Sequence, residues 1–336
     1  MSLPPPTSGA AVPPAAGADL MIEMHDVMKS YGEQLALDHI DLEVPRGVIV
    51  GLIGPSGCGK TTLVKTLTGI IGPTSGDVRV FGTDPAAFDT ATRRRFGYMP
   101  QLPVLYQNLS VWGNLNFIAS IYGMSLRHRR RRLKQLLELV DLGQHRSKLL
   151  GECSGGMQRR LTLAATLVHD PELLFLDEPT AGVDPILRER FWAHFRSLRD
   201  NGSTILVPTQ YVGEAAACDL VAVMALGRLI TVLPPGHLAP FAYGGTPLAV
   251  EFRQDWVSGE QLTRLEEQSF VREVTRTDWG VVVVVDDSQG GEREVRSLLE
   301  SASVSVGEIS PLEPSLDEIF VKIVEAHTTD AERAAA

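Results

Sequence analysis

The feature that most constrains the fold of this chain is a glycine-rich turn set between an apolar run and a helix-like stretch. The run Val48–Ile53 leads directly into the turn, which has the sequence Gly-Pro-Ser-Gly-Cys-Gly from Gly54 to Gly59. The stretch Lys60–Leu67 follows and is predicted to be a helix. A strand, a glycine loop and a helix in this order begin a parallel α/β domain.

The turn and its next two residues also fit the phosphate-binding loop pattern Gly-x4-Gly-Lys-Thr in full. The glycines let backbone N–H groups point inward at the phosphates of a nucleotide. Lys60 reaches the β/γ oxygens, and the Thr61 hydroxyl is offered to Mg²⁺. We therefore predict that the following residues bind the nucleotide: Gly54, Pro55, Ser56, Gly57, Cys58, Gly59, Lys60, Thr61 and Thr62.

A second motif is an apolar strand, Leu173–Leu176, that ends in two carboxylates, Asp177 and Glu178. In open α/β sheets, ligands bind in the crevice at the carboxyl ends of parallel strands. Asp177 is predicted to hold Mg²⁺ through water, and Glu178 is predicted to polarise an attacking water molecule. An isolated acidic turn would carry little weight, but its pairing with the phosphate loop makes it informative.

A third motif, Ser154-Gly155-Gly156, precedes the apolar helix Leu161–Leu167. A serine and two glycines before a helix make a further anion-binding N-terminus, because the helix dipole and the free N–H groups point the same way. The chain therefore offers two helix N-termini that suit phosphate.

In this order the three motifs resemble those of the ATP-binding subunit of an ABC transporter, over about residues 20–240. Ser154-Gly155-Gly156 is similar to the family signature, with Cys153 where leucine is usual and Met157 where glutamine is common. The resemblance implies a P-loop NTPase fold of α/β class, namely an ABC-type nucleotide-binding domain with a helical subdomain. ATP and Mg²⁺ are the cofactors that it implies.

Three further features resemble the drug-resistance branch of bacterial exporters. They are the methionine at 157, the Ala-Gly-Val-Asp-Pro stretch at 181–185, and the looser match of the C-terminal sequence 314–320. The resemblance implies an ATP hydrolase that powers export of a substrate through a separate membrane-spanning permease. It also implies a peripheral location on the cytoplasmic face of the cell membrane.

The family pattern assigns roles to further positions. Tyr31 resembles the aromatic residue that stacks on adenine, and Gln101 resembles the loop glutamine that contacts Mg²⁺ and signals to the membrane partner. Asp184 resembles the aspartate that communicates between paired subunits. In such a head-to-tail pair, ATP lies between the phosphate loop of one subunit and the turn Ser154, Gly155, Gly156 of the other. The second subunit is either a second copy of this chain or a different ATPase.

One position departs from the family pattern. After the predicted strand 204–207, the family usually has a histidine that contacts the γ-phosphate, and here Gln210 stands in its place. A neutral amide can donate a hydrogen bond, but it cannot become cationic or shuttle a proton. We predict that ATP binding survives and that turnover, in which Lys60, Glu178 and Gln210 take part, is reduced.

The rest of the chain divides by composition. The Pro/Ala/Gly-rich residues 1–19 predict a disordered tail. The nucleotide-binding domain spans 20–240, with its helical subdomain at about 102–165. Residues 247–325 follow a β-α-β-β-α-β order, which predicts a small α+β accessory domain of split-βαβ type. We expect the last residues, 326–336, to be frayed.

Composition narrows the class of protein. The chain has 336 residues with 31 basic and 41 acidic side chains, a net charge of −10. Such an acidic chain is unsuited to general nucleic-acid binding, which needs a basic surface. Its three cysteines form no CxxC pair, which favours a reducing compartment. No run reaches the roughly 18 apolar residues of a membrane span, so the translocation path is assigned to another subunit.

Two alternatives to the transporter hypothesis stay open. One is a soluble member of the same superfamily that acts in repair or translation, although such proteins usually carry two nucleotide domains or a long coiled coil. The other is a regulatory nucleotide-binding module with weak turnover, which Gln210 favours. The basic run 127–132 is either a solvated helix face or a site of attraction to anionic lipid headgroups.

Overall fold

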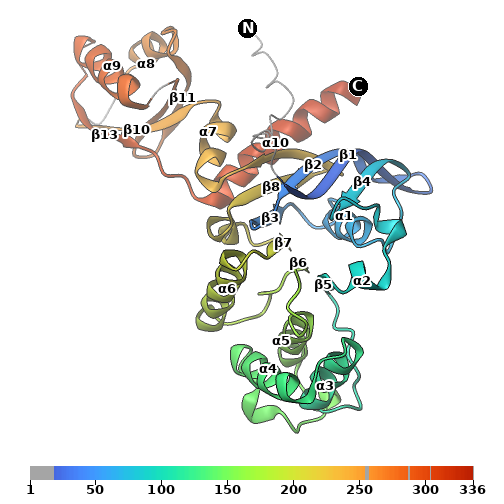
Figure 1. The fold of residues 1–336 in the computed structure, drawn as a ribbon. Coiled ribbons are helices and arrows are strands. Elements are labelled where there is room, and N and C mark those ends of the chain that lie inside the picture. The colour runs from blue at the N-terminus through green and yellow to red at the C-terminus, as the bar shows by residue number, and fades with distance from the viewer. Residues whose placement is uncertain (1–18, 254–256, 287, 303, 336) are drawn as a thin grey trace. The chain divides into compact units, whose positions relative to one another are not determined.

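The computed structural model describes residues 19–253, 257–286, 288–302 and 304–335. The chain forms two compact units, a large one that ends at Leu233 and a small one that begins at Pro234 (Figure 1). Of the predicted disordered tail, residues 1–18 lie outside the described residues. Asp19 is described, and its carbonyl oxygen accepts a hydrogen bond from the Arg46 amide at 3.1 Å.

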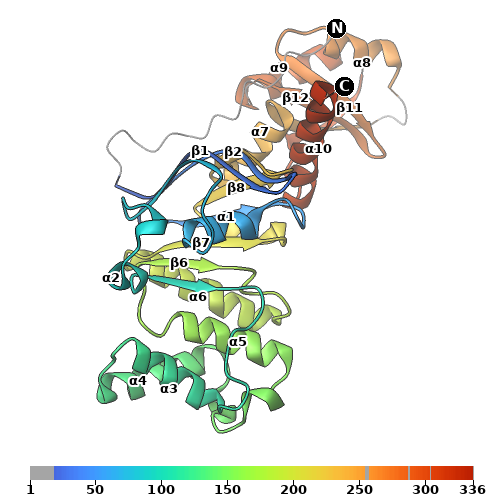
Figure 2. The same ribbon diagram turned by 90° about the vertical axis from the view of Figure 1, so that its right-hand side faces the viewer.

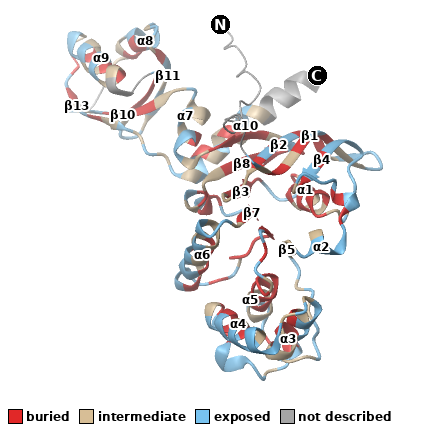
Figure 3. Cartoon of the chain, viewed as in Figure 1, coloured by how far each residue is buried: buried red, intermediate tan, exposed pale blue. Residues whose placement is uncertain are grey.

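The large unit is built on a six-stranded sheet whose order is β5-β6-β7-β3-β8-β9. Its strands are β3 Ile49–Ile53, β5 Phe96–Met99, β6 Leu173–Leu176, β7 Thr204–Thr209, β8 Leu220–Ala225 and β9 Arg228–Leu233. All neighbours are parallel except β8 and β9, which are antiparallel. Every residue of β3, β6 and β7 is buried (Figure 3), as expected for parallel strands covered on both faces.

A second, antiparallel sheet in the same unit has the order β2-β1-β4. Its strands are β1 Leu20–Tyr31, β2 Gln34–Pro45 and β4 Ser75–Val80. Helix α1, Lys60–Leu67, lies between the two sheets (Figure 2), and its residues Leu63, Val64 and Leu67 are fully buried in their shared core. The helix that follows the phosphate loop is thus held by apolar packing on two sides.

Between β5 and β6 the chain forms a helical region from α3 Val111–Ile121, α4 Leu126–Leu139 and α5 Gly155–Thr166. Side chains cap two of these helices: the Ser110 hydroxyl accepts from the Gly113 amide at 3.0 Å, and Ser154 accepts from Met157 at 3.3 Å. The remaining helices of the unit are η1 Pro85–Ala87, α2 Thr90–Arg93, η2 Gly143–His145, η3 Leu150–Glu152, α6 Pro185–Asp200 and η4 Val212–Ala217.

The basic run 127–132, at the start of α4, contains two arginines with structural contacts and four exposed residues. Arg129 donates to the Ser120 hydroxyl at 2.7 Å and to the Met124 carbonyl at 2.8 Å, while Arg132 donates to the Leu167 carbonyl at 2.7 Å and pairs with Asp170. These two arginines therefore hold the helical region together. The other four residues of the run are exposed.

The small unit contains a four-stranded antiparallel sheet of order β11-β12-β10-β13. Helices α8 and α9 pack against it, and the unit has an apolar core of its own around Leu265, Val283 and Val295. The element order is the β-α-β-β-α-β that the sequence predicts. The elements are η5 Pro235–His237, α7 Leu238–Tyr243, β10 Thr246–Phe252, α8 Gly259–Glu266, β11 Val271–Thr277, β12 Gly280–Val285, α9 Ser288–Ser301, β13 Val306–Pro311 and α10 Leu316–Ala335.

Helix α10 continues to Ala335, and no glycine or proline interrupts its last residues. The predicted fraying of residues 326–336 stays a prediction. Residue 336 lies outside the described residues. Within the described ranges, no helix combines the length and the apolar character that a membrane crossing requires.

Candidate functional site

A cavity of about 680 Å³ opens beside the phosphate loop in the large unit. Its walls include loop residues 55–62, the side chains at the ends of β5 and β6, and Tyr31 at the end of β1. Of the predicted site residues, the structure brings these together around the cavity: Tyr31, Pro55, Ser56, Gly57, Cys58, Gly59, Lys60, Thr61, Thr62, Gln101, Asp177 and Glu178.

The backbone of the loop requires glycine at specific places. Gly59 has a φ of 112°, and a Cβ there would lie 2.5 Å from the Ala36 carbonyl oxygen. At Gly54, a Cβ would lie 2.3 Å from the carbonyl oxygen of Met224. Helix α1 begins directly after Gly59 with no side-chain cap, so its first N–H groups are available to an anion.

Lys60 and Thr61, the first residues of α1, carry the side chains that suit a metal-bound triphosphate. The buried Lys60 ammonium donates to the carbonyls of Gly54 at 2.6 Å and Pro55 at 2.9 Å. These are contacts within its own loop that phosphate oxygens can replace. The Thr61 hydroxyl donates to a carboxylate oxygen of Asp177 at 3.3 Å.

The donor set around Thr61 fits Mg²⁺. Burial raises the pKa of Asp177, and the nearby Glu178 carboxylate adds to the rise. A divalent cation at this carboxylate would offset that cost. Gln101 lines the same cavity with an amide oxygen, so a hydroxyl, a carboxylate and an amide are all present, and these oxygen ligands are the kind that Mg²⁺ prefers.

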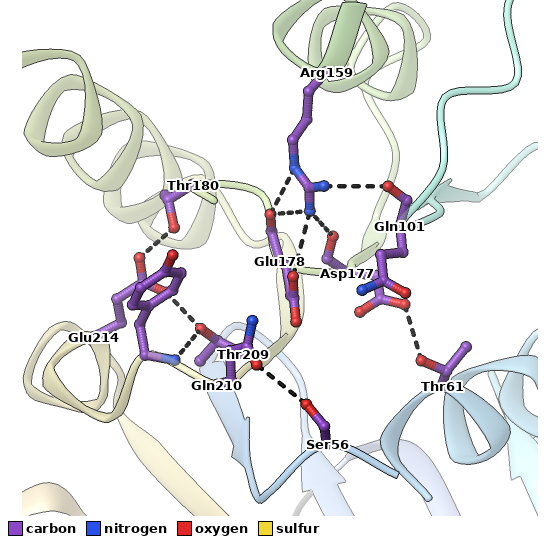
Figure 4. A network of polar contacts seen from close by, with 11 residues as sticks. Ser56, Thr61, Gln101, Arg159, Asp177, Glu178, Thr180, Thr209, Gln210 and Glu214 are labelled. Atoms are coloured by element: carbon purple, nitrogen blue, oxygen red, sulfur yellow. Dashed lines mark hydrogen bonds and ion pairs between the residues drawn. The ribbon is translucent and has the colours of Figure 1, made fainter. Parts of the chain in front are cut away.

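Glu178 is held in an uncommon backbone conformation. Its φ is 50°, in the left-handed region that costs a residue with a side chain about 1–2 kcal/mol. Its amide donates to the Pro208 carbonyl at 2.8 Å, and its own carbonyl accepts from the Arg159 guanidinium at 3.0 Å (Figure 4). Strained backbone of this kind is often found at functional sites.

Gln210 follows β7 and approaches the phosphate loop. Its amide oxygen accepts a hydrogen bond from the Ser56 hydroxyl at 3.3 Å (Figure 4). The position predicted to sense the γ-phosphate therefore lies against the loop that would bind it, although Gln210 does not line the cavity itself.

The remaining predicted residues do not line the cavity. The turn Ser154, Gly155 and Gly156 is exposed at the start of α5. Asp184 caps α6, where its carboxylate accepts from the Leu187 amide at 3.0 Å.

Tyr31 lines the cavity with 49% of its surface exposed, which leaves its ring open to a stacking partner.

A buried carboxylate near Gln210 was missed by the sequence reasoning. Glu214 on η4 is 6% exposed and accepts hydrogen bonds from the hydroxyls of Thr180 and Thr209, the latter at 2.9 Å. It thereby ties the segment after Glu178 to the end of β7 (Figure 4). The only signal in the sequence is a single charged residue in the otherwise small or apolar segment 212–217.

Arg159 was also missed as a site residue. It lies on α5 and donates to backbone carbonyls beside the cavity, and in the sequence it is one of two adjacent arginines with nothing to distinguish them.

Comparison with known proteins agrees with this geometry. Residues 37–181 match the family model described as ABC transporter. The daunorubicin resistance ATP-binding protein DrrA3 of Streptomyces coeruleorubidus is 36% identical over 307 residues, which cover 91% of this chain and 96% of that protein. The chain belongs to the family of ABC transporter ATP-binding proteins. The daunorubicin/doxorubicin resistance ATP-binding protein DrrA of Streptomyces peucetius is 35% identical, with 92% and 93% covered.

Other members of the ABC family match a smaller share of the chain. The probable multidrug ABC transporter ATP-binding protein YbhF of Escherichia coli is 39% identical over 220 residues, and this chain spans 38% of its length. A solved ATP-binding subunit of an ABC transporter is 28% identical, covers 66% of this chain and superposes with a TM-score of 0.62. The predicted P-loop NTPase fold and the ABC-transporter resemblance are therefore confirmed.

The buried carboxylate gives a stability prediction. Glu214→Ala removes the acceptor for two buried hydroxyls, so we expect the free energy of unfolding of the large unit to fall by about 2–4 kcal/mol. Glu214→Gln keeps an acceptor oxygen and should lose less. The measurement is urea unfolding followed by circular dichroism. Glu138→Ala, an exposed position on α4, is the control and should change the value by no more than about 0.5 kcal/mol. Equal stability of Glu214→Ala and the parent chain would contradict the assigned role.

Proposed function

We propose that this chain binds and hydrolyses MgATP and thereby powers export of a substrate through a separate membrane-spanning permease. The observation that carries the proposal is the convergence of Lys60, Thr61, Asp177 and Glu178 on one cavity, from loops far apart in the sequence. Family membership and the drug-resistance relatives support the same conclusion.

Each residue has a distinct part in the proposed reaction. The N–H groups of the phosphate loop and the Lys60 ammonium bind the phosphates and stabilise charge that develops during transfer. Thr61, Gln101 and Asp177 hold Mg²⁺, which when bound neutralises charge on the β and γ phosphates. The Glu178 carboxylate orients the attacking water and accepts its proton. Tyr31 stacks on the adenine, since an aromatic face binds a purine without base-specific hydrogen bonds.

The exposed predicted residues suit a second subunit. The turn Ser154, Gly155, Gly156 is exposed at the N-terminus of α5, and Asp184 lies at the exposed start of α6. We propose that they complete the site of a neighbouring ATP-binding subunit, either a second copy or a different ATPase. A bacterial ABC transporter cassette solved as a dimer, 26% identical with a TM-score of 0.60, supports this arrangement.

An exposed apolar segment supports the proposal that this chain binds a permease. Large apolar side chains that face solvent mark interaction sites when they gather in one segment. Six of them lie between residues 102 and 126, at the start of the helical region, and we call these the 102–126 apolar residues. They are Leu102, Val104, Tyr106, Phe117, Ile121 and Leu126. A peripheral location on the cytoplasmic face of the membrane follows from docking at this segment.

The hydrolysis proposal predicts a separation of binding from turnover. Glu178→Gln removes the proton acceptor, so we expect kcat to fall by about 10²-fold or more while ATP still binds. The measurement is phosphate release by the purified chain with MgATP. In a second experiment, EDTA removes the metal and should also stop turnover. Lys60→Ala should weaken nucleotide binding itself. Full turnover by Glu178→Gln would exclude the assigned base.

The glutamine at 210 predicts a gain of activity. If the neutral amide slows hydrolysis, Gln210→His should raise kcat by about threefold or more, because imidazole can become cationic and move a proton. Gln135→His, on the exposed face of α4, is the control and should leave kcat unchanged. An unchanged rate in Gln210→His would show that the glutamine does not limit turnover. A parent chain with no turnover that gains none would favour the regulatory alternative.

The permease proposal predicts a specific loss of membrane association. Leu102→Ser combined with Val104→Ser removes side chains that are 77% and 78% exposed, so folding should be unaffected. We expect gentle detergent extraction from native cells to recover about tenfold less of a co-purifying multi-spanning membrane protein. Ile70→Ser, an exposed apolar control, should recover it normally. Recovery of the parent chain with ribosomes or DNA instead would favour the soluble alternative.

A further inference from the structure

Arg159 makes an unusual set of contacts from the first turns of α5. Its guanidinium donates to the carbonyl oxygens of three residues: Glu178, with Nε at 3.0 Å, Asp177 at 3.1 Å and Gln101 at 3.2 Å (Figure 4). The side chain is only 16% exposed, and its closest carboxylate oxygen, on Glu178, is 3.9 Å away. An almost buried cation is therefore bound mainly by backbone oxygens of the two loops that line the cavity.

We infer that Arg159 is a positioning residue for ATP hydrolysis, which fixes the backbone that carries Glu178 and so ties helix α5 to the proposed catalytic carboxylate. The inference rests on the hydrolytic role assigned to Glu178 above. The planar guanidinium suits this role, because its donors lie in a fixed fork and can serve several acceptors at once.

The conformation of Glu178 explains why such a residue is needed. A φ of 50° is disfavoured for a residue with a side chain, and the segment would relax without restraint. The amide of Glu178 is bound by the Pro208 carbonyl, and its carbonyl is bound by Arg159. Anchors on both sides of the residue hold the turn, which aims the carboxylate into the cavity.

The position of Arg159 adds a connection along the chain. Helix α5 begins at the turn Ser154, Gly155, Gly156, and Arg159 follows within two turns. A displacement of this helix would therefore move the anchor of Glu178. In the proposed pair, this turn would contact the ATP of the second subunit. Movement of α5 when that ATP binds would therefore shift the Glu178 carboxylate through Arg159.

The next residue provides a matched control. Arg160 lies on the same helix, its side chain is 19% exposed, and it donates to the Val140 and Asp141 carbonyls at 2.9 and 3.3 Å. It thus resembles Arg159 in charge, burial and type of contact. However, its partners lie within the helical region, at the end of α4 and just beyond it, rather than beside the cavity.

The test compares Arg159→Gln, Arg159→Lys and Arg160→Gln in the full chain. We expect Arg159→Gln to lower kcat for MgATP about tenfold or more, since small displacements of a catalytic group have large effects. KM and the dissociation constant of the fluorescent analogue TNP-ATP should stay within about twofold. Arg159→Lys keeps the charge but not the fork, so its kcat should be intermediate. Arg160→Gln should keep kcat within about twofold.

A double-variant cycle separates positioning from general damage. If Arg159 acts through Glu178, adding Arg159→Gln to Glu178→Gln should change the residual single-turnover rate by less than about twofold. A further tenfold loss in that background, or an equal loss in Arg160→Gln, would overturn the inference. So would full turnover in Arg159→Gln while Glu178→Gln is inactive, and this result would leave the proposed function intact. A parent chain that does not hydrolyse MgATP would overturn both.

Discussion

The candidate site depends on the burial of strand β3 between β7 and β8. All five of its residues are inaccessible to solvent, and both neighbours run parallel to it. Parallel strands present their carboxyl ends at the same edge, so the phosphate loop after β3, the carboxylates after β6 and Gln210 after β7 meet there. Apolar packing thus decides which loops come together, and the polar contacts decide how each side chain is aimed.

The difference between local sequence patterns and contacts formed only after folding explains what could be predicted from the sequence. The phosphate loop, the helix Lys60–Leu67 and the strand Leu173–Leu176 were predicted with the bounds that the structure has, because each depends on local pattern. Arg159 and Glu214 were missed, because their importance lies in contacts with segments 18 to 58 and 5 to 34 residues away. Nothing in the neighbouring residues distinguishes Arg159 from Arg160 until the chain has folded.

The surroundings of Glu178 show how a strained turn is maintained. The residue adopts a left-handed φ. Its amide donates a hydrogen bond to the Pro208 carbonyl, and its carbonyl accepts one from the guanidinium of Arg159. Two residues further along, the Thr180 hydroxyl is bound by Glu214, which also binds Thr209. Three elements, α5, η4 and the end of β7, therefore restrain the segment that carries the carboxylate. Such over-determination is what allows an unfavourable conformation to persist.

The burial of the polar groups also separates the site into two classes of residue. Lys60, Asp177 and Glu178 are nearly inaccessible and have protein partners, so their geometry is established within one chain. The turn Ser154, Gly155, Gly156 is exposed at the N-terminus of a helix, a position that suits an anion from outside the chain. Arg159 joins the two classes, since it starts on the helix of the exposed turn and ends on the backbone of the buried carboxylates. The guanidinium of Arg159 is therefore the contact through which the helix of the exposed turn reaches the backbone of Asp177 and Glu178.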